Sequence, residues 1–240
     1  MTTTLRIATL FMGLMLLALP AQAQGNKDFD DCFKVFGDNG IAICSDAISS
    51  GRYSGVQLGD LYHARGYKWH DKGQYERALA DYDIALSINP RLGDALFNRG
   101  VTQQKIGNHD QALEDFQKTI EIKPAADAYY NRGISFEATK QYDRAIDAYS
   151  QAIRMNPQYV AAFNNRGIVY YNRGEYQRAL QDYNEAVRLD PRHARAHNNI
   201  GLVYEKLGQR ENAIASYRRA LEFDPNLTQA RENLRNLGVN

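Results

Sequence analysis

Apolar residues in this chain recur at helical spacing, in paired segments that return every 33 or 34 residues. In residues 160–193, apolar and small residues three or four positions apart mark one helix as far as Gly174, and the same spacing resumes after this glycine. The pattern therefore predicts two helices joined by a tight turn. Four further stretches carry the same pattern, at 59–92, 93–125, 126–159 and 194–225.

Small and aromatic residues fix the register of these blocks. A glycine within the first predicted helix is followed twelve residues later by an alanine, sixteen later by an aromatic residue and 24 later by a proline. The glycines are Gly66, Gly100, Gly133, Gly167 and Gly201. Because a glycine inside a helix costs about 1 kcal/mol relative to alanine, we expect close approach of the glycine to the facing alanine to offset the cost. Repetition at this period predicts stacked helical hairpins rather than a compact catalytic domain.

The blocks resemble tetratricopeptide repeats. The resemblance is carried by the Gly, aromatic, Gly, Ala, aromatic, Ala and Pro positions, as in RGIVYYNRGEYQRALQDYNEAVRLDP (166–191), and it extends over about 59–227. It implies an all-α fold, a right-handed α-solenoid of about five helix-turn-helix repeats, with capping helices at 24–58 and 226–240. Single positions depart from the pattern: Lys140 replaces the turn glycine of the third block, and His197 replaces an aromatic residue of the fifth.

The N-terminus has the features of a signal peptide at residues 1–23. Arg6 precedes an apolar run at 7–19, and Ala21-Gln22-Ala23 supplies the small residues that signal peptidase requires. We expect cleavage near Ala23 and a periplasmic or secreted protein without stable membrane insertion. An uncleaved membrane anchor is the alternative, although the apolar run is short for a span.

The chain has only two cysteines, Cys32 and Cys44. In an exported protein an isolated pair usually forms a disulfide, and these two flank a turn signal at 37–40. We therefore expect a degenerate N-terminal capping hairpin within 24–58, closed by a Cys32–Cys44 disulfide. Such cysteine-bearing leaders resemble those of exported bacterial tetratricopeptide proteins. A redox-active pair is the alternative, but the spacing is far from CxxC.

Charge and motifs argue against several classes of function. Without Arg6, the chain carries 28 basic and 28 acidic residues, whereas a nucleic-acid partner requires a basic face. No catalytic or phosphate-binding motif occurs, and we expect no cofactor. His193 and His197 have a spacing compatible with metal binding, but His197 takes an aromatic packing position, so we expect no metal site.

Charged residues recur with the repeat. An arginine stands directly before the signature glycine in four blocks. In the first, second and fourth blocks an aspartate stands fifteen residues after this glycine. We predict an ion pair between the two helices of these hairpins. The third block lacks it, because Ala148 replaces the aspartate.

Two sets of residues on the first helices are candidates for peptide binding. In tetratricopeptide proteins these helices line the inner wall of the solenoid. An asparagine two places before the glycine can bind a peptide backbone through its amide, and aromatic residues off the packing stripe can contact a partner. The candidates are Asn98, Asn131, Asn165 and Asn199, with Phe97, Tyr67, Tyr130 and Tyr171. The alternatives are asparagines that bond within their own hairpin and aromatics that pack between hairpins.

The sequence thus favours an exported, non-enzymatic interaction module. Its groove would bind an extended peptide segment of another protein with micromolar affinity. A structural role through self-association, with a homo-oligomer as the product, is the alternative.

Overall fold

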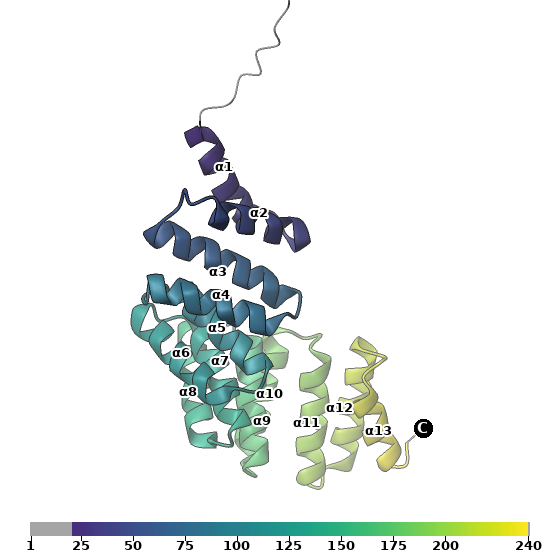
Figure 1. Cartoon of the computed structure of the whole chain (residues 1–240). Helices are drawn as coiled ribbons and strands as arrows, with labels where there is room; N and C mark the ends of the chain where they lie inside the picture. The colour runs from purple at the N-terminus through teal and green to yellow at the C-terminus, as the bar shows by residue number, and fades with distance from the viewer. Residues whose placement is uncertain (1–20, 240) are drawn as a thin grey trace, which may run out of the picture.

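The computed structural model describes residues 21–239, with side chains from residue 27, as helices packed in chain order (Figure 1). No strand occurs in this part of the chain. The helices are α1 (Ala21–Lys34), α2 (Gly37–Ser49), α3 (Gly55–Asp71), α4 (Tyr75–Ile88), α5 (Gly93–Lys105), α6 (His109–Ile122), α7 (Ala126–Ala138), α8 (Tyr142–Met155), α9 (Val160–Asn172), α10 (Tyr176–Leu189), α11 (Ala194–Lys206), α12 (Arg210–Phe223) and α13 (Thr228–Asn236). The predicted all-α solenoid is confirmed.

Consecutive helices from α3 to α12 form five hairpins, which we number 1 to 5 in chain order. The two helices of each hairpin pack most extensively against each other, and the second helix also packs against the first helix of the next hairpin. The array curves into an arc with the pair α1–α2 at one end and α13 at the other (Figure 1). Because each hairpin packs against the units next to it in the array, the core is a row of small clusters rather than one central cluster.

The signature glycines make room for aromatic rings. A β-carbon at Gly66 would lie 2.8 Å from Cε1 of Tyr82, and one at Gly133 would lie 2.5 Å from Cε1 of Tyr149. Glycine at this position therefore lets the ring of the second helix lie directly on the backbone of the first. The sequence predicted that the facing alanine would be the main contact of the glycine, and this was wrong. The carbonyl of Ala78 is near Gly66, but the Tyr82 ring is nearer.

The predicted ion pairs are confirmed in hairpins 1, 2 and 4. In hairpin 4, Arg166 donates from Nε and from a terminal nitrogen to both carboxylate oxygens of Asp182, at 2.8 and 2.7 Å. The equivalent pairs, Arg65–Asp81 and Arg99–Asp115, have the same geometry. All three aspartates are buried. Each arginine also donates to the preceding second helix, for example from Arg166 to Ser150 at 2.8 Å. These residues thus join three helices.

The N-terminal cap consists of α1 and α2, joined by the Cys32–Cys44 disulfide. Both cysteines are fully buried with Ala47 and Leu61. The turn predicted at 37–40 was wrong, because α2 begins at Gly37, whose φ of +67° lets the chain reverse before this residue. Asp38 then lies in the first turn of the helix, where a negative charge is favourable.

Most of the predicted signal peptide lies outside the described residues; only 21–23 are included, as the start of α1. Along residues 21–239, no helix combines the length and apolar character that a bilayer crossing requires.

Candidate peptide-binding surface

The asparagines of the first helices connect successive hairpins. Asn165 donates to the hydroxyl of Tyr130 at 3.1 Å, and Asn199 donates to Oδ1 of Asn164 at 3.1 Å. The Asn98 amide lies 2.9 Å from Nε2 of His63. In each case the partner stands three places before the signature glycine of the preceding hairpin. We call these contacts the asparagine bridges. The sequence allowed two alternatives for the asparagines: side chains free to bind a peptide, or side chains that bond within their own hairpin. The structure shows neither for Asn98, Asn165 and Asn199, because each of them contacts the preceding hairpin.

Asn131 differs from the other three asparagines. Its partner position in the preceding hairpin is Phe97, whose ring has no hydrogen-bond acceptor. The Asn131 amide instead donates to the carbonyl of Asp127 in its own helix, at 2.9 Å. Asn131 is therefore the member of the row whose side chain is not fixed to another hairpin.

Two adjoining cavities open along the first helices of hairpins 3 to 5. The first, of about 520 Å³, lies over α7 and α9, and the second, of about 570 Å³, lies over α9, α11 and the start of α13. They share Asn165 and Ile168, so together they form one continuous surface, which we call the inner groove. Its lining comprises Ile134, Glu137, Ala138, Lys140, Tyr142, Asn164, Asn165, Ile168, Asn172, Arg195, Asn198, Asn199, Asp224, Asn226, Leu227, Thr228 and Gln229.

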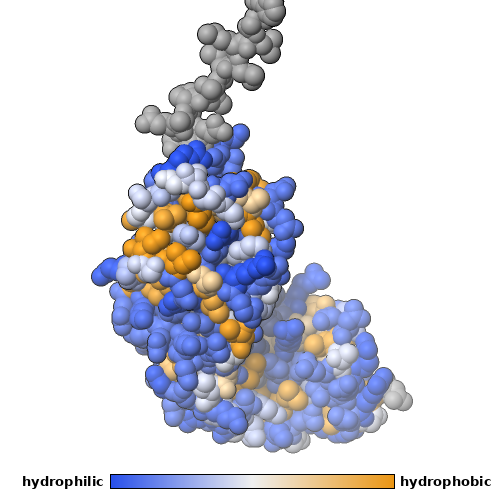
Figure 2. Space-filling view, in the orientation of Figure 1, coloured by the Kyte–Doolittle hydropathy of each residue, from blue (hydrophilic) through white to orange (hydrophobic). Residues whose placement is uncertain are grey.

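The inner groove combines an apolar strip with polar walls. Ile134 and Ile168 supply apolar surface, while amides dominate its C-terminal half. Glu137 is a half-buried carboxylate there: desolvation raises the pKa of Glu137, while the Tyr149 hydroxyl, which donates to it at 2.8 Å, opposes the rise. A surface of this kind suits a polypeptide backbone with apolar side chains better than a strongly charged ligand. The space-filling view shows a hollow between the arms of the arc, within a largely hydrophilic surface (Figure 2).

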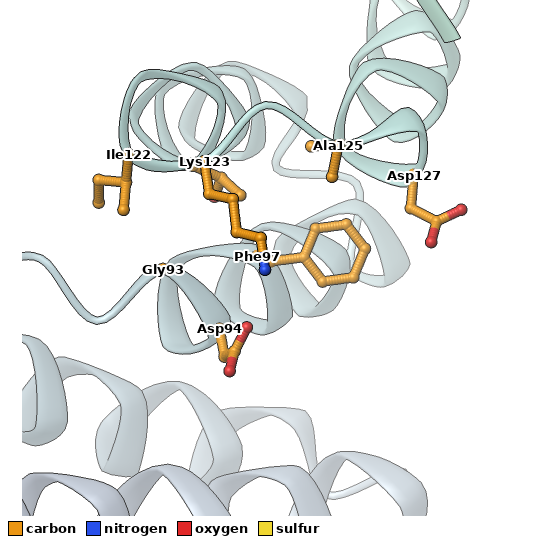
Figure 3. Close-up of a pocket in the computed structure, with 9 residues that line it drawn as sticks. Gly93, Asp94, Phe97, Ile122, Lys123, Ala125 and Asp127 are labelled. Carbon is orange, nitrogen blue, oxygen red and sulfur yellow. The ribbon is translucent and has the colours of Figure 1, made fainter. Parts of the chain in front are cut away.

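A separate cavity of about 450 Å³ lies between hairpins 2 and 3. Phe97 points into it, with Asp94 and Asp127 to either side and Lys123 reaching toward the ring (Figure 3). Phe97 also packs on Phe116, with 5.9 Å between ring centroids. The structure thus places Phe97 at a cavity, but away from the inner groove.

The predicted tyrosines occupy different environments. Tyr67 on α3 is 44% exposed, whereas Tyr171 is half-buried and packs on Tyr176 at 5.6 Å. Tyr130 stacks on Tyr149 and Tyr159, at 5.8 and 4.9 Å, and accepts the Asn165 bridge. The structure does not bring these three tyrosines together. The contact of Tyr130 with Tyr159 is of the kind that the alternative of packing between hairpins describes, whereas the ring contact of Tyr171 with Tyr176 lies within hairpin 4.

The histidine pair has other partners in the structure. Nδ1 of His193 accepts from the backbone amide of Ala196, and His197 packs on Phe223 and contacts the carbonyl of Pro191. Among the described residues, no three histidine, cysteine or acidic side chains come together in a way that could hold a metal.

Sequence reasoning missed the C-terminal part of the inner groove. Asp224, Thr228 and Gln229 come from the last turn and from α13. The signal was available, because α13 begins 34 residues after α11, just as α11 begins 34 residues after α9.

Comparisons with known proteins give one family. Models described as the TPR repeat or tetratricopeptide repeat match residues 59–107, 93–125, 126–159, 148–181, 169–208 and 194–227. A search of curated proteins found no match.

Solved structures agree in fold. A crystal structure of MamA is 31% identical, covers 68% of this chain and 96% of its own, and superposes with a TM-score of 0.64. YrrB, described as a TPR protein with an unusual peptide-binding site, is 23% identical, with 80% and 97% covered and a TM-score of 0.65. TTC0263, a TPR protein of Thermus thermophilus, is 24% identical, with 75% and 98% covered and a TM-score of 0.59.

Proposed function

Since the chain belongs to the tetratricopeptide repeat family, whose members are generally non-enzymatic interaction modules, we propose that it is an adaptor for another protein. The inner groove binds an extended segment of the partner, which lies across α7, α9 and α11. The continuity of the two cavities through Asn165 and Ile168 carries this proposal, because a linear segment needs an unbroken surface. YrrB is an example of the fold with a peptide-binding site.

Apolar contacts supply most of the affinity in this proposal. The amide hydrogens of Asn165 and Asn199 are used in the asparagine bridges, so these residues offer a peptide fewer donors than a free row would. One hydrogen bond contributes about 0.5–1.5 kcal/mol, whereas association costs about 4–15 kcal/mol. Burial of partner side chains on Ile134 and Ile168 must therefore add to the polar contacts, and we expect micromolar affinity.

Site-specific photocrosslinking in intact cells tests the proposal. A benzoylphenylalanine at Asn172, an exposed residue that lines the inner groove, should capture one recurrent polypeptide. The same group at Gln181, exposed on α10, is the matched control and should not. Ile168→Glu should suppress capture from position 172. Equal capture from both positions would contradict the proposal, and capture of a second copy alone would favour the self-associating alternative.

We also propose that the adaptor works after export. The sequence features of residues 1–23 and the Cys32–Cys44 disulfide support this, because such bonds persist in oxidising compartments. Mass spectrometry of the protein purified from its native cells should find an N-terminus at Gln24 and oxidised cysteines. A full-length chain with reduced cysteines in the cytoplasm would refute export.

A further inference from the structure

The last helix occupies the place of the first helix of a sixth hairpin. Asn233 donates to Oδ1 of Asn198 at 3.1 Å, which is one more asparagine bridge. Ala230 and Leu234 are buried against hairpin 5. The repeat register therefore extends through α13, and positions in this helix can be compared with those of the hairpins.

Residues 234 and 235 of α13 differ from the residues at the equivalent positions of the hairpins, and the difference leaves nearby arginines without an ion-pair partner among the described residues. Arg235 stands at the position of the signature glycine, and Leu234 stands where hairpin 4 has Arg166. In hairpin 4 that arginine donates to Ser150 of the preceding second helix. Arg218 is the residue equivalent to Ser150, and Leu234, at the position of the donating arginine, has no polar group to offer it. The hydrogen bond between successive hairpins is thus replaced by a basic, open site.

A cavity of about 470 Å³ lies at this site, between α12 and α13. Leu221, Leu234 and Val239 form its apolar part, and the arginines complete its lining: Arg218, Arg231 and Arg235. All three arginines are exposed, and none of them makes an ion pair with a residue in the described part of the chain. Arg231 donates to the carbonyl of Pro225. By contrast, Arg219, one residue from Arg218, pairs with Glu222.

We propose that this cavity binds the C-terminal residue of a polypeptide that ends in an apolar side chain. Guanidinium groups bind carboxylates in a two-pronged geometry, and here they adjoin an apolar surface. A chain terminus presents a carboxylate within a few ångströms of its own side chain, so one residue satisfies both halves of the site. The cavity is distinct from the inner groove: Thr228 and Gln229 of α13 line the groove, whereas Arg231 and Arg235 line this cavity. The proposal therefore stands apart from the proposed function.

Fluorescence anisotropy with the full chain tests the site. The probe is a labelled hexapeptide Gly-Ser-Gly-Ser-Val-Leu with a free C-terminal carboxylate, and its matched control is the same peptide with a C-terminal amide. We expect the amide to bind at least tenfold more weakly, and affinity for the free acid to fall with salt. Equal binding of acid and amide, or no binding of either, would overturn the proposal.

Variants locate the binding. Arg218→Gln and Arg235→Gln should each weaken the free-acid peptide about fivefold, while circular dichroism shows that the helices are intact. Arg188→Gln removes an exposed arginine that is already paired with Glu185, and it should leave binding unchanged. If Arg188→Gln weakens binding as much as the other two, the site is wrong.

Two competitors separate the sources of the carboxylate. An amidated hexapeptide with an internal Glu-Leu pair should compete poorly. Decanoate presents a carboxylate on an apolar chain without a peptide, and it should also compete poorly because it lacks the Cα branch point that lets a terminal residue place its carboxylate and its side chain on different parts of the site. Strong competition by either compound would overturn the assignment to a chain terminus.

Discussion

Hairpins 3 and 4 are neighbours with the same apolar pattern, but their polar contacts differ. Hairpin 4 has the two-pronged pair between Arg166 and Asp182, which is extended to Ser150. In hairpin 3, Ala148 replaces the aspartate, and Arg132 donates to Gln117 and stacks on aromatic rings. The Nε of Arg132 is buried without an acceptor, and burial lowers the pKa of this arginine.

Hairpins 3 and 4 also differ in the turn between their helices and in their asparagine bridges. Gly174 ends the first helix of hairpin 4 at φ +78°, while Lys140 takes the same left-handed conformation at φ +57° in hairpin 3. The Asn165 side chain bridges to hairpin 3, but the Asn131 side chain bonds within its own helix. Hairpin 3 nevertheless folds like its neighbour. Small and aromatic residues therefore determine the architecture, and polar contacts adjust the stability of each unit. We expect hairpin 3 to open more readily than hairpin 4.

The largest effect should follow from breaking the pair in hairpin 4. Asp182→Ala leaves Arg166 with no carboxylate, and loss of one partner of a buried pair costs about 3–5 kcal/mol. Urea unfolding followed by circular dichroism measures the loss. Glu185→Ala is the control, since it breaks the exposed pair with Arg188 on the same helix and should cost no more than about 0.5 kcal/mol. Similar losses for both variants would show that the buried pair has no special role.

The converse change should stabilise hairpin 3. Ala148→Asp supplies the acceptor that Arg132 lacks, and hydrogen bonds to charged groups contribute about 1.5–3 kcal/mol before the burial of the new carboxylate is deducted. We expect a gain of about 1 kcal/mol in the free energy of unfolding. In an Arg132→Met background the same substitution should destabilise, because the aspartate is then buried alone. A loss in both backgrounds would mean that the position cannot accept a carboxylate.

The contrast between the hairpins shows what the sequence can predict. The ion pairs were predictable because Arg166 and Asp182 recur together in other blocks at the same separation. The absence of the pair at Ala148 was equally visible. Both features belong to positions that repeat with the block, so comparing equivalent positions detects them.

The asparagine bridges escaped prediction for a related reason. Each bridge joins two positions that are not equivalent, such as Tyr130 and Asn165, on successive hairpins. A comparison of equivalent positions shows the asparagine row but not its partners, so the row was interpreted as a surface free for a peptide. The ring above each glycine was also missed, because the alanine is equally periodic and only packing distinguishes the two. Asn165 and Asn199 of the inner groove were among the predicted residues, whereas its lining from α13 was not.

Removing the strain at the turn of hairpin 3 should have a smaller effect. A residue with a β-carbon is disfavoured at positive φ, so Lys140→Gly should stabilise by about 0.5–1 kcal/mol after the greater chain entropy of glycine is deducted. Lys140→Ala is the matched control, because it removes the same charge and side chain but keeps the unfavourable conformation. Equal gains from the two variants would assign the effect to charge.

The smallest effect on stability should come from the asparagine bridge between Asn98 and His63, because the acceptor in this bridge is a histidine that can be protonated. At the joint of hairpins 1 and 2, Nε2 of His63 faces the Asn98 amide at 2.9 Å, so the bridge needs the neutral ring. Burial lowers the pKa of His63, and the nearby Asp94 opposes this shift. Because the unfolded chain then binds the proton more readily, this contribution to stability is complete above the unfolded pKa of about 6.5 and is lost as the pH falls below it.

Hydrogen exchange as a function of pH can compare the joint of hairpins 1 and 2 with the joint of hairpins 3 and 4. After correction for the intrinsic exchange rate, acidification from pH 7.5 to 5.5 should reduce protection in α3 and α5 more than in α7 and α9. The second joint relies on Tyr130, whose pKa burial raises further, so its bridge does not titrate in this range. His63→Asn keeps an acceptor like Asn164 and should lessen the difference. Part of the difference should persist, because burial also lowers the pKa of His70, which contacts Thr102 across the same joint. If α3 and α5 responded no more than α7 and α9, the histidine would not control this bridge.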